Sequence, residues 1–567
     1  MATNTKTPIA FRLLAIMYDK LVVALKNNTA YKKYLFVNSL FNEDSIEDKE
    51  KYFIIYLCNI LFAGFQVFVT NIKTRCYIDI IINTIQMIHK RHSIVDLKLY
   101  HPDKFGVFIM ALKRLIDSDD WTRVCGIHGD TFKPNDNGVK CPTDPTIVTD
   151  LGQTGEPFYC KHSVYSFIAW HAPYVFQFEL LLNKYNESSD KSYITLPWID
   201  LTDFSADYQF MNQPDIRILY EGERITTENP LAGAYYYVNG VKTKTTRNGF
   251  LSPSTRKQRM QLNNVRKELG RAMNAPNYET FSSAAGNKVT YTPLETPHNS
   301  LHDIIGGKNG NMSSIDISAF DPMFWFHHCN MDRYYWNWTY EITNRFSHPI
   351  YPRYMTDATA KERCAPFGSH SIYSHDWNTY DWGWRNGSNT YAHVKDVLDL
   401  VKFPYYYDKM DAALEKEPIA SKCLIIDFHT SPYNVQETRC LANTYKNTWI
   451  ELSDIPIPPE SVEINAYIYE KGKPLDRETD YAGSAFWFGI DRAKIHCPRC
   501  LTGKTNLKID IKQFMTEMEI DETNIDNYNI LIEGEGLLSG EQENSVFRVY
   551  TESELVQNGA SQLVCWV

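Results

Sequence analysis

Histidines at metal-ligand spacing are the first feature of this sequence that can do chemistry. His298 and His302 lie four residues apart in the run PLETPHNSLHDIIGG. On a helix both imidazoles project from one face, so the pair can bind one metal ion. The alternative is a surface or capping pair. A zinc protease is not indicated, because that chemistry needs Glu directly after the first His, and this chain has Asn299 there.

A third ligand for the same metal follows in the run SAFDPMFWFHHCNMDRYYW. Asp321 can cap a helix that begins at Pro322. That helix carries His327 and His328, and adjacent helical positions differ by about 100° in direction, so one of the two is expected to reach the metal. We choose His328, because Asp332 lies one turn beyond it and can orient its ring. His327 is then expected to pack beside the ligands.

A second set of three histidines lies upstream: His128 in CGIHGD, His162 in YCKHSVYSF and His171 in FIAWHAPYVFQFE. Nine residues apart, His162 and His171 would point to opposite sides of one helix, so His162 is expected in a loop before it. Glu179, two turns beyond His171, is a candidate buried partner. Cys160 lies two residues before His162, where thiolate and imidazole can share a metal or become linked to each other.

Six imidazoles in two triplets, without carboxylates among the proposed ligands, favour copper over calcium or magnesium and leave coordination positions open. We interpret the two triplets as one dinuclear site. Two separate zinc sites are the competing interpretation, since three histidines and a water also form a catalytic zinc shell. The ligand types alone do not decide between them.

The composition describes the chain that must position these ligands. Its 567 residues are 43% hydrophobic, 22% charged and 14% aromatic, which indicates a folded protein of several domains. A net charge of -10, without a long basic run, argues against nucleic acid as a partner. The 12 unevenly spaced cysteines do not form the framework of a small secreted domain, and the first residues lack a secretory signal pattern. A cytoplasmic location is therefore expected.

One segment raises the question of a membrane. Tyr52 to Ile72 is an uncharged run long enough to span a bilayer. Polar or small residues recur in it every three or four positions, as on one face of a packed helix: Asn59, Ala63, Gln66 and Thr70. We expect a buried helix, with a membrane span as the alternative.

The fragments GIHG, CKH, WHAPYV, PHNSLHDIIGG and SAFDPMFWFHHCNMDR together resemble the type 3 copper proteins, and among them the fungal-type tyrosinases. The resemblance covers roughly residues 100 to 410. It implies a multidomain, mainly α protein with a helical core of the four-helix-bundle type and two copper ions. It assigns one copper to His128, His162 and His171, and the other to His298, His302 and His328.

The chain divides into three predicted parts. Residues 1–97 form an N-terminal helical extension, because apolar clusters alternate with charged breaks there. Residues 98–411 form the dicopper catalytic domain, in which FPYYY at 403–407 resembles the family's closing tyrosine motif. Residues 412–567 form a linker and a β-sandwich, predicted from the alternating runs SVEINAYIYE, NLKIDI, YNILIE and VFRVY.

The family chemistry implied by the resemblance is oxidation of small phenolic substrates with O2 as co-substrate. Glu295 and Asn299 resemble the pair that holds an activating water for monophenols; alternatively they are a helix-entry Glu and a solvated Asn. Ile315 corresponds to the gate above the second copper. Cys160 resembles the cysteine that forms a thioether with His162, with a free thiol as the alternative. Ala172 departs from the family, where many members have Arg.

The run YAGSAFWFGI resembles the lid domain of latent fungal tyrosinases and molluscan haemocyanins. Phe486, Trp487 or Phe488 is then the candidate plug of the active site, and buried core aromatics are the alternative. Cys497 and Cys500 form a lone CxxC whose role stays open between copper transfer, metal binding and a disulfide.

The expected function is that of a tyrosinase, oxidising phenols such as tyrosine and catechols such as DOPA to o-quinones, for melanin-type pigment. The alternatives are a catechol oxidase without hydroxylase activity and a haemocyanin-like oxygen carrier.

Overall fold

The computed structural model describes residues 89–129, 159–238, 241–283, 292–343, 349–368, 391–398, 400, 403–408, 422–427, 434–438, 448–456, 461–489, 504–520, 524–535 and 545–549. The helices are α5 (Ile94–Tyr100), α6 (Pro102–Ile116), α7 (Asp119–Gly126), α8 (Phe167–Lys184), α9 (Arg256–Ala272), α10 (Tyr278–Ser282), α11 (Glu295–Gly306), α12 (Met323–Ile342), α13 (Asp357–Ala360), α14 (Val394–Val397) and α16 (Lys512–Glu517). The strands before residue 410 are β1 (His89–Arg91), β2 (Asp215–Tyr220), β3 (Glu223–Glu228), β4 (Tyr235–Val238), β5 (Val241–Lys244), β6 (Arg363–Gly368), β7 (Tyr391–His393) and β8 (Tyr405–Tyr407). The later strands are β9 (Lys422–Asp427), β10 (Asn434–Thr438), β11 (Thr448–Pro456), β12 (Val462–Glu470), β13 (Tyr481–Trp487), β14 (Lys504–Asp510), β15 (Tyr528–Glu535) and β16 (Ser545–Val549).

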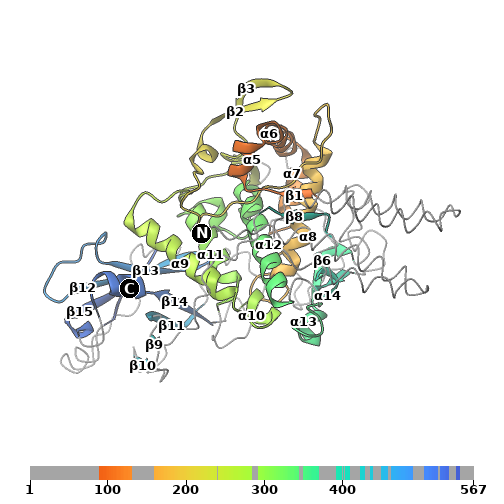
Figure 1. Ribbon diagram of the computed structural model, residues 1–567. Coiled ribbons are helices and arrows are strands. Elements are labelled where there is room, and N and C mark those ends of the chain that lie inside the picture. Colours follow the sequence, from red (N-terminus) through yellow and green to blue (C-terminus); the bar gives the residue numbers. More distant parts are fainter. Residues whose placement is uncertain are drawn as a thin grey trace, which may run out of the picture.

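Helices α8, α11 and α12 form the centre of the helical part (Figure 1). Every residue from 167 to 182 in α8 is buried, as expected for a helix that is apolar nearly all round. Helix α11 ends at Gly307, whose φ of 63° is in the left-handed region and whose amide donates to the Asp303 carbonyl at 2.8 Å. These three helices place four of the six predicted ligands in the interior.

Two local predictions concern the starts of these helices. The first is confirmed, because His162 lies outside α8, which begins at Phe167. The second is correct only in place: α12 begins at Met323, one residue later than predicted, and its N-cap is Pro322 rather than Asp321. Asp321 lies just before the N-cap, and its Oδ1 accepts a hydrogen bond from the Met323 amide at 2.9 Å.

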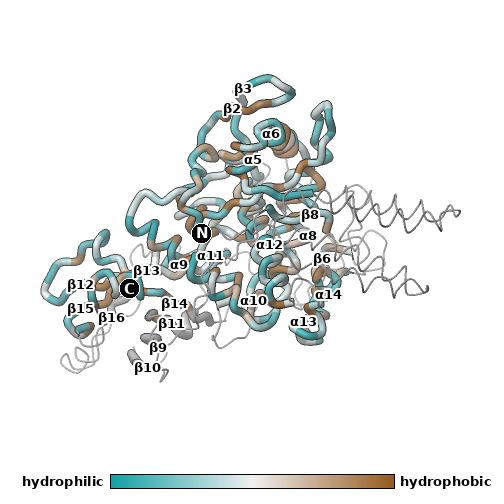
Figure 2. The backbone as a smooth tube through the Cα atoms, viewed as in Figure 1, coloured by the Kyte–Doolittle hydropathy of each residue, from teal (hydrophilic) through white to brown (hydrophobic). Residues whose placement is uncertain are grey.

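Two four-stranded sheets follow the helical part, in the orders β10-β9-β11-β14 and β13-β12-β15-β16. The four alternating runs in the sequence are confirmed as strands β12, β14, β15 and β16. Apolar side chains of β11, β12, β13, β14 and β15 form a second core cluster, which Met260 of α9 joins. Brown, apolar stretches of the tube occur both among the inner helices and in β12 and β15 (Figure 2). The helical part and the sheets therefore meet at α9.

The described chain begins with strand β1, where the sequence pattern predicts helix. Strand β1 pairs in parallel with β8, in the register His89 to Tyr405 and Arg91 to Tyr407. The helical prediction fails here because pairing with a distant strand decides the local structure. Tyr52 to Ile72 and the Cys497 and Cys500 pair lie outside the described residues. Within the described part of the chain, no helix has the length and apolarity needed to cross a membrane.

Candidate metal centre

The upstream histidines come from three segments. His128 follows α7, His162 lies in the loop before α8, and His171 lies in the first turns of α8. The backbone just after His128 packs closely against that of Ile315, since a Cβ on Gly129 would lie 2.7 Å from the Ile315 carbonyl oxygen. A glycine after His128 is therefore required sterically.

Two of these rings are oriented by backbone carbonyls. The Nδ1 of His128 donates to the Ile315 oxygen at 2.7 Å, and the Nδ1 of His171 donates to the Phe167 oxygen at 2.8 Å. A carbonyl oxygen only accepts, so Nδ1 carries the proton in each ring and Nε2 keeps its lone pair for a metal. The Nε2 of His128 is buried and has no hydrogen-bond partner, as an unfilled ligand position would be.

The downstream histidines come from two helices. His298 and His302 lie one turn apart on α11, and the Nε2 atom of each is 3.2 Å from the Nε2 of His328 on α12. The Nδ1 of His302 donates to the Met312 oxygen at 2.8 Å, and that of His298 donates to Asn299 Oδ1 at 2.9 Å. Three Nε2 atoms therefore converge on one point.

The two groups face each other. The rings of His171 and His328 stack with centroids 4.3 Å apart, and those of His162 and His298 are 5.6 Å apart. Candidate ligand atoms lie within 4.8 Å of one another in each group; the groups are His128, Cys160, His162 and His171, and His298, His302, His327 and His328. The structure thus brings all six predicted ligands together.

The electrostatics of the centre favour neutral imidazoles. Burial lowers the pKa of every one of these histidines, to about 3 for His128 and His327. A neutral imidazole is the form that binds a metal. Neither group contains a carboxylate. Buried imidazole nitrogens without acids fit copper, and they do not fit calcium or magnesium.

Cys160 lies inside the upstream group. Its Sγ is 3.2 Å from His162 Nδ1 and 3.5 Å from His171 Nε2. Burial raises the pKa of the thiol well above its usual range, so without a metal it stays protonated. The sulfur is close enough to His162 for the thioether implied by the resemblance, and the bridge itself stays a prediction.

Glu295 and Asn299 lie at the start of α11. The two oxygens of the buried Glu295 accept hydrogen bonds from the Ser163 amide, at 2.7 Å, and from the Ser283 hydroxyl. Ser163 has a φ of 56°, so this bond fixes a strained residue beside His162. Burial raises the pKa of Glu295 to about 7. Asn299 is turned toward His298, as described above.

The chain after residue 460 reaches this centre through Phe488. Its ring stacks on His302 with centroids 4.2 Å apart, and it is 5.5 Å from the His162 ring. Phe486 packs on the main core, and Trp487 packs on the core of the sheets. Ile315 lies at the same edge, because its amide donates to the Gly489 oxygen at 3.3 Å.

Two predicted partner contacts are wrong. Glu179 does not bond His171; its oxygens accept from Arg91 Nε at 2.7 Å and from the Tyr193 hydroxyl at 3.1 Å. Asp332 does not orient His328. The Nδ1 of His328 and the Oδ1 of Asp332 are buried without a hydrogen bond.

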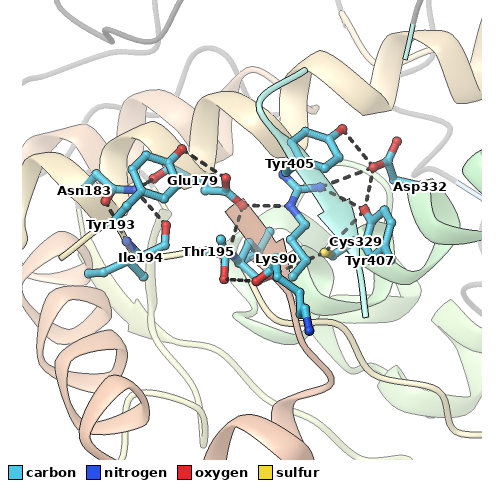
Figure 3. Close-up of polar contacts among 12 residues, drawn as sticks. Lys90, Glu179, Asn183, Tyr193, Ile194, Thr195, Cys329, Asp332, Tyr405 and Tyr407 are labelled. Atoms are coloured by element: carbon cyan, nitrogen blue, oxygen red, sulfur yellow. Dashed lines mark hydrogen bonds and ion pairs between the residues drawn. The ribbon is translucent and has the colours of Figure 1, made fainter. Parts of the chain in front are cut away.

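Instead, both acids bind Arg91 in a buried network that the sequence did not predict. Figure 3 shows Glu179 and Asp332 in this network, with Tyr405 and Tyr407 beside Asp332. The Oδ2 of Asp332 accepts from Arg91 at 3.2 Å, from Tyr405 at 2.9 Å and from Tyr407 at 2.5 Å. The guanidinium lies 3.3 Å from the Tyr405 ring centroid. The tyrosine motif was visible in the sequence, but a single Arg in the run HKRHS carries no local signal of burial.

His327 is the other surprise, because the structure places it in the downstream group rather than only beside it. Its Nε2 is buried without a hydrogen-bond partner. Its ring centroid is 5.0 Å from that of His298 and 4.8 Å from that of His302. Adjacent helical positions differ in direction, yet the rings of His327 and His328 both lie within 5.4 Å of the rings of His298 and His302.

Comparison with known proteins agrees with this site. Residues 118–341 match the family model described as the common central domain of tyrosinase. The chain is 28% identical over 319 residues to a tyrosinase of Neurospora crassa, covering 47% of this chain and 45% of that protein. It is 28% identical over 299 residues to a tyrosinase of Podospora anserina, covering 44% and 50%. The chain thus spans about half the length of these relatives.

Solved structures show the same fold. A recombinant mushroom tyrosinase aligns with a TM-score of 0.53 and 16% identity, over 81% of this chain and 97% of that one. Deoxygenated haemocyanin from Rapana thomasiana aligns with a TM-score of 0.52 and 18% identity, over 82% and 99%. The fold is therefore shared with both a tyrosinase and a haemocyanin.

Proposed function

Because the chain belongs to the tyrosinase family of type 3 copper proteins, we propose that it is a latent tyrosinase converting monophenols such as tyrosine, and catechols such as DOPA, to o-quinones with O2. The observation that carries the proposal is the pair of facing, buried histidine groups without a carboxylate. One copper would be held by His128, His162 and His171, and the other by His298, His302 and His328. Melanin-type pigment is the proposed downstream product.

The protein groups supply binding, orientation and proton movement, while two bound copper ions would supply the redox chemistry with O2. Backbone carbonyls fix the rings of His128, His171 and His302 so that each Nε2 faces the centre. Burial excludes water and keeps these rings neutral.

Monophenol hydroxylation needs removal of the phenol proton, and Glu295 with Asn299 is the proposed pair for it. A carboxylate whose pKa is about 7 suits a base that works near neutral pH. Each carboxylate oxygen already accepts one protein hydrogen bond and retains a second lone pair, with which it can hold a water. Ile315 is the proposed gate residue above the second copper.

Latency is proposed to follow from Phe488, whose ring covers His302 where a phenol ring would stack. The neighbouring candidates fit this role less well. Phe486 and Trp487 contribute to the two hydrophobic cores, so their exchange would disturb packing more than access.

Copper content and absorption of the oxygenated protein test the proposal together. Two coppers per chain and an intense near-ultraviolet band are expected. Zinc alone, with no such band, would contradict it and favour a hydrolase.

Activity assays separate the remaining alternatives. After cleavage of the chain between residues 408 and 422, a tyrosinase oxidises both tyrosine and DOPA. A catechol oxidase would act only on the diphenol. The haemocyanin-like alternative is favoured by the structural match to an oxygen carrier, and it predicts reversible O2 binding with no oxidase activity after cleavage.

A further inference from the structure

Helix α9 presents basic side chains to an acidic surface of the C-terminal sheets. Figure 1 shows α9 lying beside β13. The contact, here called the α9 seam, joins four basic residues of the helix to three acidic residues after residue 460: Arg256, Lys257, Lys267 and Arg271, with Glu463, Asp510 and Glu517. The charges across the seam are therefore complementary.

The strongest pair lies at the C-terminal end of α9. Arg271 and Asp510 form an ion pair at 2.5 Å, with side chains only 10% and 6% exposed. Lys267 lies 3.7 Å from the other oxygen of Asp510. Water screens a pair of this burial weakly, so it contributes more than a surface ion pair does.

The other pairs lie toward the start of the helix. Lys257 contacts Glu463 at 2.9 Å, and Gln261 donates to the same carboxylate at 2.7 Å. Arg256 pairs with Glu517 at 2.7 Å and donates to the Tyr481 carbonyl at 3.0 Å. The seam thus follows the whole helix.

The seam is connected to the metal centre through strand β13. Gly483 in this strand lies so close to the Asp510 carbonyl oxygen that a Cβ there would be 2.6 Å from it. Five residues further along the chain, Phe488 stacks on His302. The strand that α9 and Asp510 hold in place is therefore the strand that leads directly into Phe488.

The apolar part of the same contact is small by comparison. Met260 is the one residue of α9 in the core cluster of the sheets, within the described residues. Next to Phe488, the Ile315 amide makes a long hydrogen bond of 3.3 Å to the Gly489 oxygen. Along α9 the contact is therefore mainly between charged groups, and the apolar contacts of the same region to the helical part come from Phe486 and Phe488.

We propose that the α9 seam is an electrostatic autoinhibitory contact: it holds β13 and Phe488 over the metal centre, and weakening it exposes the site without cleavage of the chain. The inference rests on the proposed function in taking the uncovered site to be a phenol oxidase and Phe488 to be its plug.

The first test is DOPA oxidase activity of the intact, copper-loaded chain carrying Arg271→Ala. Truncating Arg271 removes the nearer cation of the buried Asp510 and leaves only Lys267 at 3.7 Å, so at least about tenfold more activity than in the unmodified chain is expected. Arg266→Ala is the matched control, because Arg266 is an exposed residue of the same helix. Equal DOPA oxidase activity of the intact Arg271→Ala and Arg266→Ala chains would overturn the proposal.

Sodium chloride provides a second measurement without any substitution. The Debye length falls from about 30 Å at 0.01 M to about 3 Å at 1 M, so salt weakens the partly exposed pairs of Arg256 with Glu517 and of Lys257 with Glu463. The activity of the intact chain is therefore expected to rise with salt. Activity of the chain cleaved between residues 408 and 422 is expected to stay constant. If the intact chain does not respond, the seam is not what holds the lid.

Exchanging the two charges of one ion pair tests whether misfolding, rather than loss of the pair, raises the activity. Lys257→Glu and Glu463→Lys should each raise the activity of the intact chain, and the double variant should restore latency. Hydrogen exchange of the Ile315 amide reports opening independently, and should follow the same order. Additive single effects would contradict the seam. An inactive cleaved chain would contradict the oxidase proposal instead, so the two failures are distinguishable.

Discussion

The two histidine groups are built in different ways. In the downstream group, all candidate ligands lie on α11 and α12, so helix geometry sets their directions. In the upstream group, His128 and His162 lie outside helices. The distant Ile315 carbonyl holds His128, and the bond from Ser163 to the distant Glu295 holds the loop of His162, whose ring also contacts the neighbouring Cys160. One half of the site is therefore fixed by local structure and the other half by tertiary contacts.

The largest expected effect is on copper binding by the downstream group. His328→Ala should remove the second copper and lower oxidase activity by more than about 100-fold, since loss of residues that only support a ligand already costs about 10 to 100-fold. His327→Ala is the matched control and should retain two coppers. Metal analysis of the purified variants checks this. Loss of copper only in the His327 variant would reverse the assignment.

The next largest effect tests the contacts that hold the upstream group in place. Glu295→Ala removes the hydrogen bonds from the Ser163 amide and the Ser283 hydroxyl. The copper affinity of the upstream group should therefore fall about 10 to 100-fold. Glu295→Gln can still accept from the Ser163 amide and should keep most of that affinity. Equilibrium dialysis against a copper chelator measures it. Equal affinities in the Ala and Gln variants would contradict a supporting role.

The pH dependence of the two activities sharpens the role of the same residue. Burial raises the pKa of Glu295 to about 7, so its base form is lost as pH falls through about 7. Monophenol hydroxylation by the cleaved chain should therefore decline below pH 7 more steeply than diphenol oxidation. In Glu295→Gln the two pH profiles should become parallel. Parallel profiles in the unmodified chain would exclude Glu295 as the base.

Phe488 covers the downstream group, so truncating its side chain should ease entry of substrate to the site and leave the copper content unchanged. Phe488→Ala is expected to raise the activity of the intact chain about tenfold, because roughly 1.4 kcal/mol of lost stacking and burial suffices for that factor. Copper content should be unaltered. An intact chain that stays latent would place the plug elsewhere.

The smallest expected effect concerns Cys160. A thioether to His162 would lower the mass of the peptide pair by two hydrogens, which mass spectrometry detects. Cys160→Ala should weaken copper binding by the upstream group only several-fold, because His128 and His171 keep their carbonyl partners. Unlinked peptides in the copper-loaded protein would rule out the bridge.

The same division explains what could be predicted from the sequence. Helical spacing identified His298 and His302, and the capping pattern of Asp321 and Pro322 located the helix of His328, because these depend on residues close along the chain. The strands β12, β14, β15 and β16 follow from alternation for the same reason.

Partners far apart along the chain could not be predicted in this way. The sequence pattern paired Glu179 with His171 and Asp332 with His328, whereas both acids bind Arg91, 88 and 241 residues away. Nor could alternation alone choose Phe488 over Phe486, since residues two apart in a strand share a face. That choice depends on where β13 ends relative to α11.

Arg91 has a practical consequence for the limits of the catalytic unit. Its guanidinium contacts Glu179 on α8 and Asp332 on α12, and these two helices carry His171 and His328. A shortened chain starting at residue 98, the sequence-based boundary, would leave two carboxylates buried without their cation directly behind both metal-binding helices. Recombinant versions meant to retain copper should therefore start upstream of His89.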